Sequence, residues 1–423
     1  MSIILKNATF IHWQTGDQIQ TSIKVEPGVD GSIALLPAQL EGVDISKDEV
    51  IDCTGKLVTK SFAVGHHHAY SALARGMPQP PKQPENFLQI LEYIWWNLDK
   101  ALDKEMIEAS ALATAMACAK AGSTFVIDHH ASPNAILGSL EIIAKAFEQV
   151  GVSHLLCYEI SDRDGLGKAH QGLAETEAYL KARQGLVGLH ASFTVGDETM
   201  KKAVDLMQKL QSGIHIHIAE DKADQEQCLK VHNMRVVERL HQFGVLQSSK
   251  TILAHGLHLS DNERQLIRNS PAWMVENMES NLNNQVGHFN GKDLGKHIML
   301  GTDGMHSDMI RSVQAAYFGG QEHDLIDVPE AYRRFRNVHH YLSGNCFVGD
   351  GDNNLVVLDY DSPTPISSKN FLGHFIFGLS SNHIQHVISN GSWVIKNKML
   401  TQVNEREILI FIQEQALRLW KKL

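Results

Sequence analysis

The sequence predicts an α/β protein, a (β/α)8 barrel of the TIM type joined to a small β-sandwich domain that both ends of the chain build. Three observations predict it. Short apolar runs alternate with longer helical patterns through the middle of the chain, eight such runs can be counted, and β-like runs broken by Gly, Pro and Asn stand at both ends. We expect residues 1–59 and 348–423 to form the β-sandwich domain, with a closing helix, and residues 60–347 to form the barrel.

The individual elements follow in order along the chain. The first β-like runs are residues 2–13, 21–28, 31–38 and 48–53. The eight barrel strands are expected at residues 63–67, 124–128, 153–159, 186–190, 214–218, 251–255, 272–276 and 297–303. A helical pattern ends at Gly122, a residue typical of a helix C-cap. Ser260 and Glu263 have the spacing of a capping box after the sixth strand. An amphipathic helix closes the chain over residues 404–423.

The composition excludes several classes of protein. A formal net charge of −10 gives nucleic-acid phosphates no electrostatic reason to bind. No apolar run reaches membrane-spanning length, and the start of the chain lacks the pattern of a signal peptide, so we expect a cytoplasmic protein with no membrane partner. The five scattered cysteines form no Cys-x-x-Cys pair, which favours reduced thiols over disulfides or a zinc–thiolate site.

Residues 214–218 alternate isoleucine with histidine and lead into Glu220. Side chains on a strand alternate between its faces, so His215 and His217 share one face and the isoleucines share the other. An amphipathic strand with solvent-exposed histidines would explain this stretch, taken alone, equally well. The remaining chain favours metal ligands.

Five candidate side chains stand at or next to the ends of expected strands: His66, His68, His217, His255 and Asp303. A barrel directs the C-terminal ends of its strands towards one face, so these side chains are expected to meet. Three of these four imidazoles together with the carboxylate of Asp303 suit zinc or iron(II) and leave room for a bound water.

Several longer motifs resemble the amidohydrolase superfamily, in its chlorohydrolase and deaminase branch, and are most similar to the SsnA-type aminohydrolases. They include GHHHAYSALARGM, STFVIDHHASP, GLHASFTV, HIHIAED, LAHGLHLS and GTDGMHSDM, and the resemblance covers nearly the whole chain. It implies a barrel capped by a sheet domain, with Glu220 and His255 as catalytic partners and metal ligands at His66, His68, His217 and Asp303. The fourth strand lacks the lysine that two-metal members need, so one divalent metal is expected.

The resulting hypothesis is a metal-dependent hydrolase of carbon–nitrogen bonds other than peptide bonds, which deaminates an amino-substituted heterocycle. Glu220 would take a proton from the attacking water, His255 would polarise that water or stabilise the intermediate, and Asp303 would bind metal and accept a proton. One alternative is a chlorohydrolase-type dehalogenase or N-dealkylase of a similar ring. An alternative of another class is a catalytically silent metal-binding or ligand-binding accessory protein. The partner is a small-molecule substrate, and homo-oligomerisation is compatible with the fold.

Four further residues are candidates for contacting the substrate. His190 ends the fourth expected strand and His129 follows the second, where supporting a ligand or capping a helix is an equally good interpretation. Glu159 and Arg163 follow the third strand, and Arg163 could grip a substrate carboxylate or carbonyl. A surface ion-pair network is the alternative for these two.

The sequence also departs from the family pattern. Lys60-Ser61 replace Pro-Gly, Glu276 and Met278 stand where histidine and proline are common, and His306 replaces a small residue. These changes leave the identity of the substrate open. Ser280 and Asn281 are interpreted as structural residues of the loop after the seventh strand.

Overall fold

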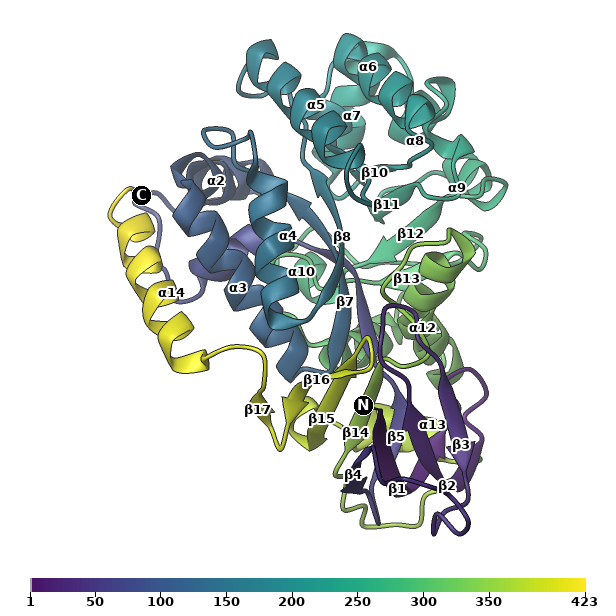
Figure 1. Ribbon diagram of the computed structural model, residues 1–423. Coiled ribbons are helices and arrows are strands. Elements are labelled where there is room, and N and C mark those ends of the chain that lie inside the picture. The colour runs from purple at the N-terminus through teal and green to yellow at the C-terminus, as the bar shows by residue number, and fades with distance from the viewer. Residues whose placement is uncertain (1) are drawn as a thin grey trace.

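The computed structural model describes residues 2–423, and its centre is a barrel of eight strands (Figure 1). The strands are β6 (Phe62–His67), β7 (Ser123–His130), β8 (Ser153–Tyr158), β9 (Val187–Ala191), β10 (Ile214–Ile218), β11 (Ile252–His255), β12 (Trp273–Glu276) and β13 (Ile298–Leu300). They form two parallel arcs, β6 to β8 and β9 to β13. Single bridges join the arcs on both sides, His67 to Asp303, and Leu156 to Gly185 with Ile160 to Leu189. The strand order therefore returns from β13 to β6, as predicted for the barrel.

The strands are buried on both faces, as expected for a parallel sheet covered by helices. Val126 and Leu156 belong to the large core shared with the helices. Their neighbours Phe125, Ile127 and Leu155 belong to a second cluster inside the barrel. The same alternation on β10 sends its three isoleucines into the core shared with the helices and its histidines into the barrel.

Helices follow every barrel strand. They are η1 (Ala69–Ala74), α1 (Phe87–Ile90), η2 (Leu91–Trp95), α2 (Trp96–Ala101), α3 (Lys104–Lys120), α4 (Ser139–Val150), α5 (Leu166–Leu180), η3 (Ser192–Thr194), α6 (Asp197–Lys209), α7 (Lys222–His232), α8 (Val236–Gln242), η4 (Val245–Gln247), α9 (Asp261–Arg268), α10 (Met278–Asn283), α11 (Met309–Gly320) and α12 (Val328–Gly344). Two predicted boundaries are confirmed. Gly122 follows α3 with a φ of 79°, and Ser260 with Glu263 forms the capping box of α9.

Both ends of the chain build one further sheet. Its strands are β1 (Ile3–Ile11), β2 (Gln18–Val25), β3 (Ile33–Leu36), β4 (Glu49–Asp52), β5 (Leu57–Lys60), β14 (Leu355–Leu358), β15 (Ile384–Ser389), β16 (Ser392–Lys396) and β17 (Met399–Leu400). The nine strands form one sheet in which β5 pairs with β14, and β1 pairs with β4 along its first half and β5 along its second. Side chains from both ends enclose a separate core, which confirms a small β domain made by both termini.

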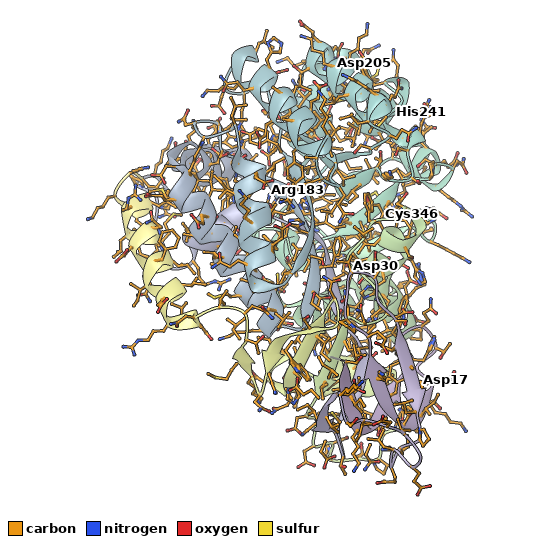
Figure 2. The ribbon with its side chains drawn as sticks, viewed as in Figure 1. Asp17, Asp30, Arg183, Asp205, His241 and Cys346 are labelled. Carbon is orange, nitrogen blue, oxygen red and sulfur yellow. The ribbon has the colours of Figure 1, made fainter. Side chains whose placement is uncertain are left out.

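The last helix follows the final strand of this sheet and packs against the barrel domain. Helix α14 (Glu405–Trp420) lies along α3 on the outside of the barrel (Figure 1), while the short α13 (Phe371–Phe377) and η5 (Ser381–His383) precede β15. The Trp420 Nε1 group donates a hydrogen bond to the Leu73 carbonyl at 2.8 Å. Among residues 2–423, no helix is both long and apolar enough to cross a membrane. All five cysteines are free, and Cys346 is the exposed one (Figure 2).

Candidate active site

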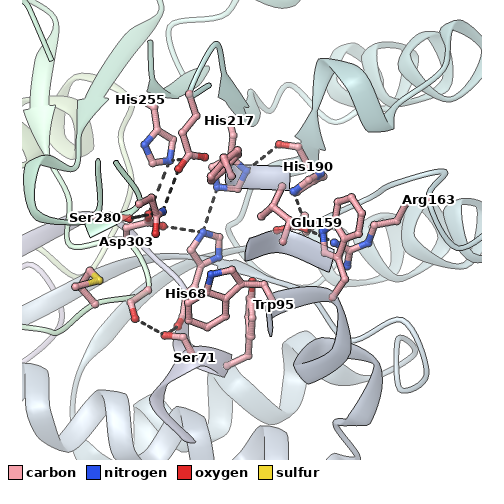
Figure 3. Close-up of a pocket in the computed structure, with 18 residues that line it drawn as sticks. His68, Ser71, Trp95, Glu159, Arg163, His190, His217, His255, Ser280 and Asp303 are labelled. Carbon is pink, nitrogen blue, oxygen red and sulfur yellow. Dashed lines mark hydrogen bonds and ion pairs between the residues drawn. The ribbon is translucent and has the colours of Figure 1, made fainter. Parts of the chain in front are cut away.

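The five predicted residues meet at the C-terminal ends of β6, β10, β11 and β13. The His68 Nε2 atom lies 3.1 Å from His217 Nε2 and 3.0 Å from Asp303 Oδ1. The His66 Nε2 atom lies 3.4 Å from the same carboxylate oxygen. His255 is farther away, with its Nε2 atom 3.9 Å from Asp303 Oδ2. Figure 3 shows His68, His217 and Asp303 converging on one point.

These donors fit a single divalent metal. Ligand atoms about 2.0–2.1 Å from a tetrahedral zinc lie about 3.3 Å from one another, close to the separations seen here. His66 Nε2 is buried and has no hydrogen-bond partner among the described residues. Donor atoms of His66, His217, His255 and Asp303 lie within 4.8 Å of one another. This cluster can therefore hold a metal ion.

The protonation of these groups also favours metal binding. Burial lowers the pKa of His66 to about 4 and holds that of His217 well below its usual value, so both imidazoles are neutral. Burial would lower the pKa of His68 too, but the hydrogen bond to Asp303 and its charge outweigh burial and raise that pKa to about 9. A metal that binds His68 must therefore displace a proton.

Backbone carbonyls orient two of the histidines. The Nδ1 group of His68 donates to the carbonyl of His129 at 2.6 Å, and the Nδ1 group of His217 donates to the carbonyl of His190 at 2.9 Å. Each bond keeps a proton on Nδ1, so the neutral form of each ring presents Nε2 to a metal, and His68 reaches that form when it loses its second proton.

His66 is oriented by another histidine instead. Its Nδ1 atom lies 2.8 Å from His215 Nε2, and His215 Nδ1 lies 3.6 Å from Cys157 Sγ. The sequence pattern places His215 inside the barrel but gives it no function. Its contact across the barrel from β10 to β6 makes it a supporting residue for His66.

Two residues at the start of α10 position the catalytic candidates. Ser280 donates a hydrogen bond to Asp303 Oδ2, and the Asn281 side-chain oxygen lies 2.8 Å from His255 Nδ1. The His255 Nε2 atom consequently faces Glu220, 3.6 Å from its Oε2 atom. The structural interpretation of Ser280 and Asn281 was therefore incomplete, because both contact site residues directly.

Glu220 is suited to exchange a proton near neutral pH. Burial raises the pKa of this carboxyl to about 7, although His255 pulls it down. The Asn284 side chain donates a hydrogen bond to Glu220 Oε1 at 3.5 Å and further favours the ionised form.

A pocket of about 610 Å³ opens above these residues. One wall is apolar and comes from the segment α1 to α2, with Phe87, Leu91, Trp95 and Trp96. Trp95 and Trp96 are only partly buried, and both line the pocket. A planar ring could stack on such a wall.

The remaining candidates form the opposite end of the pocket. Glu159, Arg163 and His190 line it, whereas His129 is fully buried behind them. Glu159 Oε2 lies 3.5 Å from His129 Nδ1, and Glu159 Oε1 lies 3.8 Å from His190 Nε2 and 3.7 Å from Arg163 Nη1. Burial raises the pKa of Glu159 to about 7, although Arg163 pulls it down. This ion-pair network is buried, so the alternative of a surface network is wrong.

The departures from the family pattern make local ion pairs and hydrogen bonds. Glu276 bonds to Arg334 of α12 at 2.9 Å, and His306 pairs with Glu279. The ammonium group of Lys60 donates to two backbone carbonyls, each at 2.9 Å. These residues lie outside the pocket lining.

The fold and site define a metal-dependent hydrolase built on a barrel. The model of the amidohydrolase family matches residues 62–333, and the chain belongs to this family. Membership confirms the predicted hydrolase of carbon–nitrogen bonds.

Two relatives resemble the chain over most of its length. A 5-methylthioadenosine/S-adenosylhomocysteine deaminase of Thermococcus sibiricus is 25% identical over 93% of this chain and 94% of its own. A 5′-deoxyadenosine deaminase of Methanopyrus kandleri is 24% identical over 90% of this chain and 91% of its own.

Solved structures share the fold. A zinc-bound adenosine deaminase from Xanthomonas campestris superposes with a TM-score of 0.82 at 15% identity, covering 99% of this chain and 98% of its own. An atrazine chlorohydrolase from Arthrobacter aurescens, complexed with zinc, gives a TM-score of 0.82 at 14% identity, covering 98% of this chain and 100% of its own. These likenesses confirm the predicted barrel with its added sheet domain.

Proposed function

We propose that the chain is an aminohydrolase with a single zinc ion that removes ammonia from an aminopurine or a related amino-substituted heterocycle. One observation carries the proposal: His66, His68, His217 and Asp303 converge on one point, and the partly buried carboxyl of Glu220 lines the same pocket. Both relatives described above are named as deaminases of adenosine derivatives, which supports aminopurines as the first substrates to test.

In this proposal His66, His68, His217 and Asp303 are the metal ligands. Zinc is preferred over iron(II) because the two structural neighbours contain zinc. Bound zinc would lower the pKa of a water molecule towards ~7 and so supply hydroxide at neutral pH.

The protein side chains move the protons and hold the developing charge. Glu220 takes a proton from the attacking water and delivers it to the substrate ring nitrogen beside the attacked carbon. His255, whose Nδ1 group donates to the Asn281 side-chain oxygen, keeps Nε2 free to accept a hydrogen bond from the attacking water and so to polarise it. A second proton reaches the amino group through Glu220 or Asp303, the carbon–nitrogen bond breaks, and ammonia leaves while the carbon keeps the oxygen.

The test measures metal content and ammonia release on the same preparations. Wild type should carry about one equivalent of zinc, and His217→Ala should lose it because a ligand is missing. Glu220→Gln should keep the zinc and lose about 10²- to 10⁴-fold in turnover, the usual contribution of a general base. Glu226→Gln on the exposed face of α7 is the matched control and should change neither quantity.

Two results would contradict the proposal. Undiminished turnover in zinc-loaded Glu220→Gln would remove the proton-transfer role, and a wild type that binds no metal after reconstitution would remove the metal site. A wild type that binds zinc but releases no ammonia from aminopurines, aminopyrimidines or triazines would favour a hydrolase that removes chloride or a substituted amine from the ring.

A further inference from the structure

The end of the pocket beyond His217 carries a second group of charges. Figure 3 shows His190, Glu159 and Arg163 on the other side of His217 from His255 and Asp303. Donor atoms of Glu159, His190 and His217 lie within 4.8 Å of one another. A substrate that reacts beside His217 therefore has Glu159 within reach of its neighbouring atoms.

Arg163 is already committed to protein partners. Its Nη2 group pairs with Asp99, its Nε group donates to Asp164 at 3.2 Å, and its Nη1 group lies 3.7 Å from Glu159. The guanidinium also lies over the Trp96 ring at 5.2 Å. Two of its three nitrogens therefore already serve protein carboxylates, and a substrate carboxylate would find only Nη1 without a hydrogen bond.

Unlike Arg163, Glu159 lacks hydrogen-bond partners for its side chain within the described residues. Its side chain is 2% exposed, yet within residues 2–423 neither carboxylate oxygen takes part in a side-chain hydrogen bond, since its nearest ionic partners stand 3.5–3.8 Å away. Buried carboxylates normally receive hydrogen bonds. Because Glu159 lines the pocket, a bound ligand can supply the missing donors.

The local charge favours donors over acceptors. Three carboxylates, of Asp99, Glu159 and Asp164, surround the single guanidinium of Arg163. Among the described residues that line the pocket, Arg163 is also the one lysine or arginine side chain. An excess of negative charge at a buried wall repels carboxylates and phosphates and attracts N–H groups.

We propose that Glu159 determines specificity by accepting paired N–H hydrogen bonds from an amidine-type or guanidine-type edge of the substrate, at or beside the reacting carbon. Two parallel N–H donors match the two oxygens of a carboxylate. The substrate is then a neutral or cationic 2-amino heterocycle without carboxylate or phosphate substituents. This inference rests on the proposed deaminase function and narrows its substrate class.

Binding of three planar probes tests the inference without turnover. Benzamidinium, benzamide and benzoate have similar shapes and differ in charge and in hydrogen-bond donors. Calorimetric titration of the zinc-loaded wild type should show the tightest binding for benzamidinium and the weakest for benzoate. In Glu159→Gln, benzamidinium should bind about 10- to 100-fold more weakly, as expected for a lost hydrogen bond to a charged group. Benzoate should bind more tightly in this variant than in wild type.

Glu279→Gln serves as the control, because this partly buried carboxylate lies outside the pocket lining and should leave all three affinities unchanged. Benzoate binding as tightly as benzamidinium to wild type would overturn the inference, and this comparison needs no variant to fold. Benzamidinium binding that survives Glu159→Gln but is lost in Glu220→Gln would assign the contact to Glu220. Loss of a metal equivalent in Glu159→Gln would make Glu159 a cation ligand instead. Because no step requires ammonia release, an inactive protein would still give a clear answer.

Discussion

Replacing His215 with phenylalanine should weaken metal binding and leave the barrel folded. His215 is fully buried, and its ring packs against His129 with centroids 4.7 Å apart. Phenylalanine keeps a ring of similar size but cannot accept the hydrogen bond from His66. When His66 Nε2 binds a metal, His66 Nδ1 must carry the proton, and the His215 Nε2 atom 2.8 Å away is its acceptor.

The size of the effect follows from this geometry. Removing a partner that supports a metal ligand lowers metal affinity about 10- to 100-fold, which equals about 1.4–2.8 kcal/mol. Leaving a buried hydrogen-bond donor without an acceptor costs about 1–3 kcal/mol, which agrees with this loss of metal affinity. The cost falls mainly on the metal-bound state, because metal-free His66 can move its proton to Nε2, 3.4 Å from Asp303.

The assay is a competition for zinc between the protein and a chelating indicator at fixed pH, with the thermal midpoint of the metal-free protein measured in parallel. His154→Phe is the matched control, since His154 is buried near the start of β8, away from the strand ends that carry the ligands. Unchanged zinc affinity in a folded His215→Phe protein would refute the reasoning. An equal loss in His154→Phe would show that any buried histidine has this effect.

The pH dependence of kcat/KM should follow Glu220, which must be ionised to accept a proton: with a pKa of about 7, activity should fall as the pH drops below that value. Asn284→Ala removes a hydrogen bond that favours ionised Glu220, so the acidic limb should move to higher pH; a limb that stays in place in a pH–rate profile would contradict this. Arg334→Met should lower the free energy of unfolding by about 3–5 kcal/mol, because it leaves the buried carboxylates of Glu276 and Asp324 unpaired. Urea denaturation measures this loss, and adding Glu276→Gln should recover part of it; wild-type stability in Arg334→Met would disprove it.

The sequence predicts the strands and the five converging residues because both depend on local spacing. A period of two places His215 and His217 on the inner face of β10. His255 ends an apolar run and Asp303 closely follows one, so barrel topology alone brings their side chains to one face.

Contacts between distant segments are not encoded in such spacing. The support of His66 by His215 depends on how β6 and β10 face each other across the barrel, where they are not neighbours. The pairing of Arg163 with protein carboxylates depends on Asp99, which lies on α2. The sequence around Arg163 shows a positive charge near a substrate site, whereas the structure shows that charge neutralised.

The joining of both chain ends in one sheet affects how the protein is made. β5 finds its partner β14 only after the whole barrel has been synthesised, and Trp420 bonds to Leu73, close to His66 and His68, later still. On the ribosome, β5 and η1, the elements on either side of the strand β6 that carries His66, therefore lack these contacts until β14 and α14 have been synthesised. Removal of α14 would consequently take a hydrogen bond from η1, the helix that directly follows His68, although 347 positions separate Trp420 from Leu73.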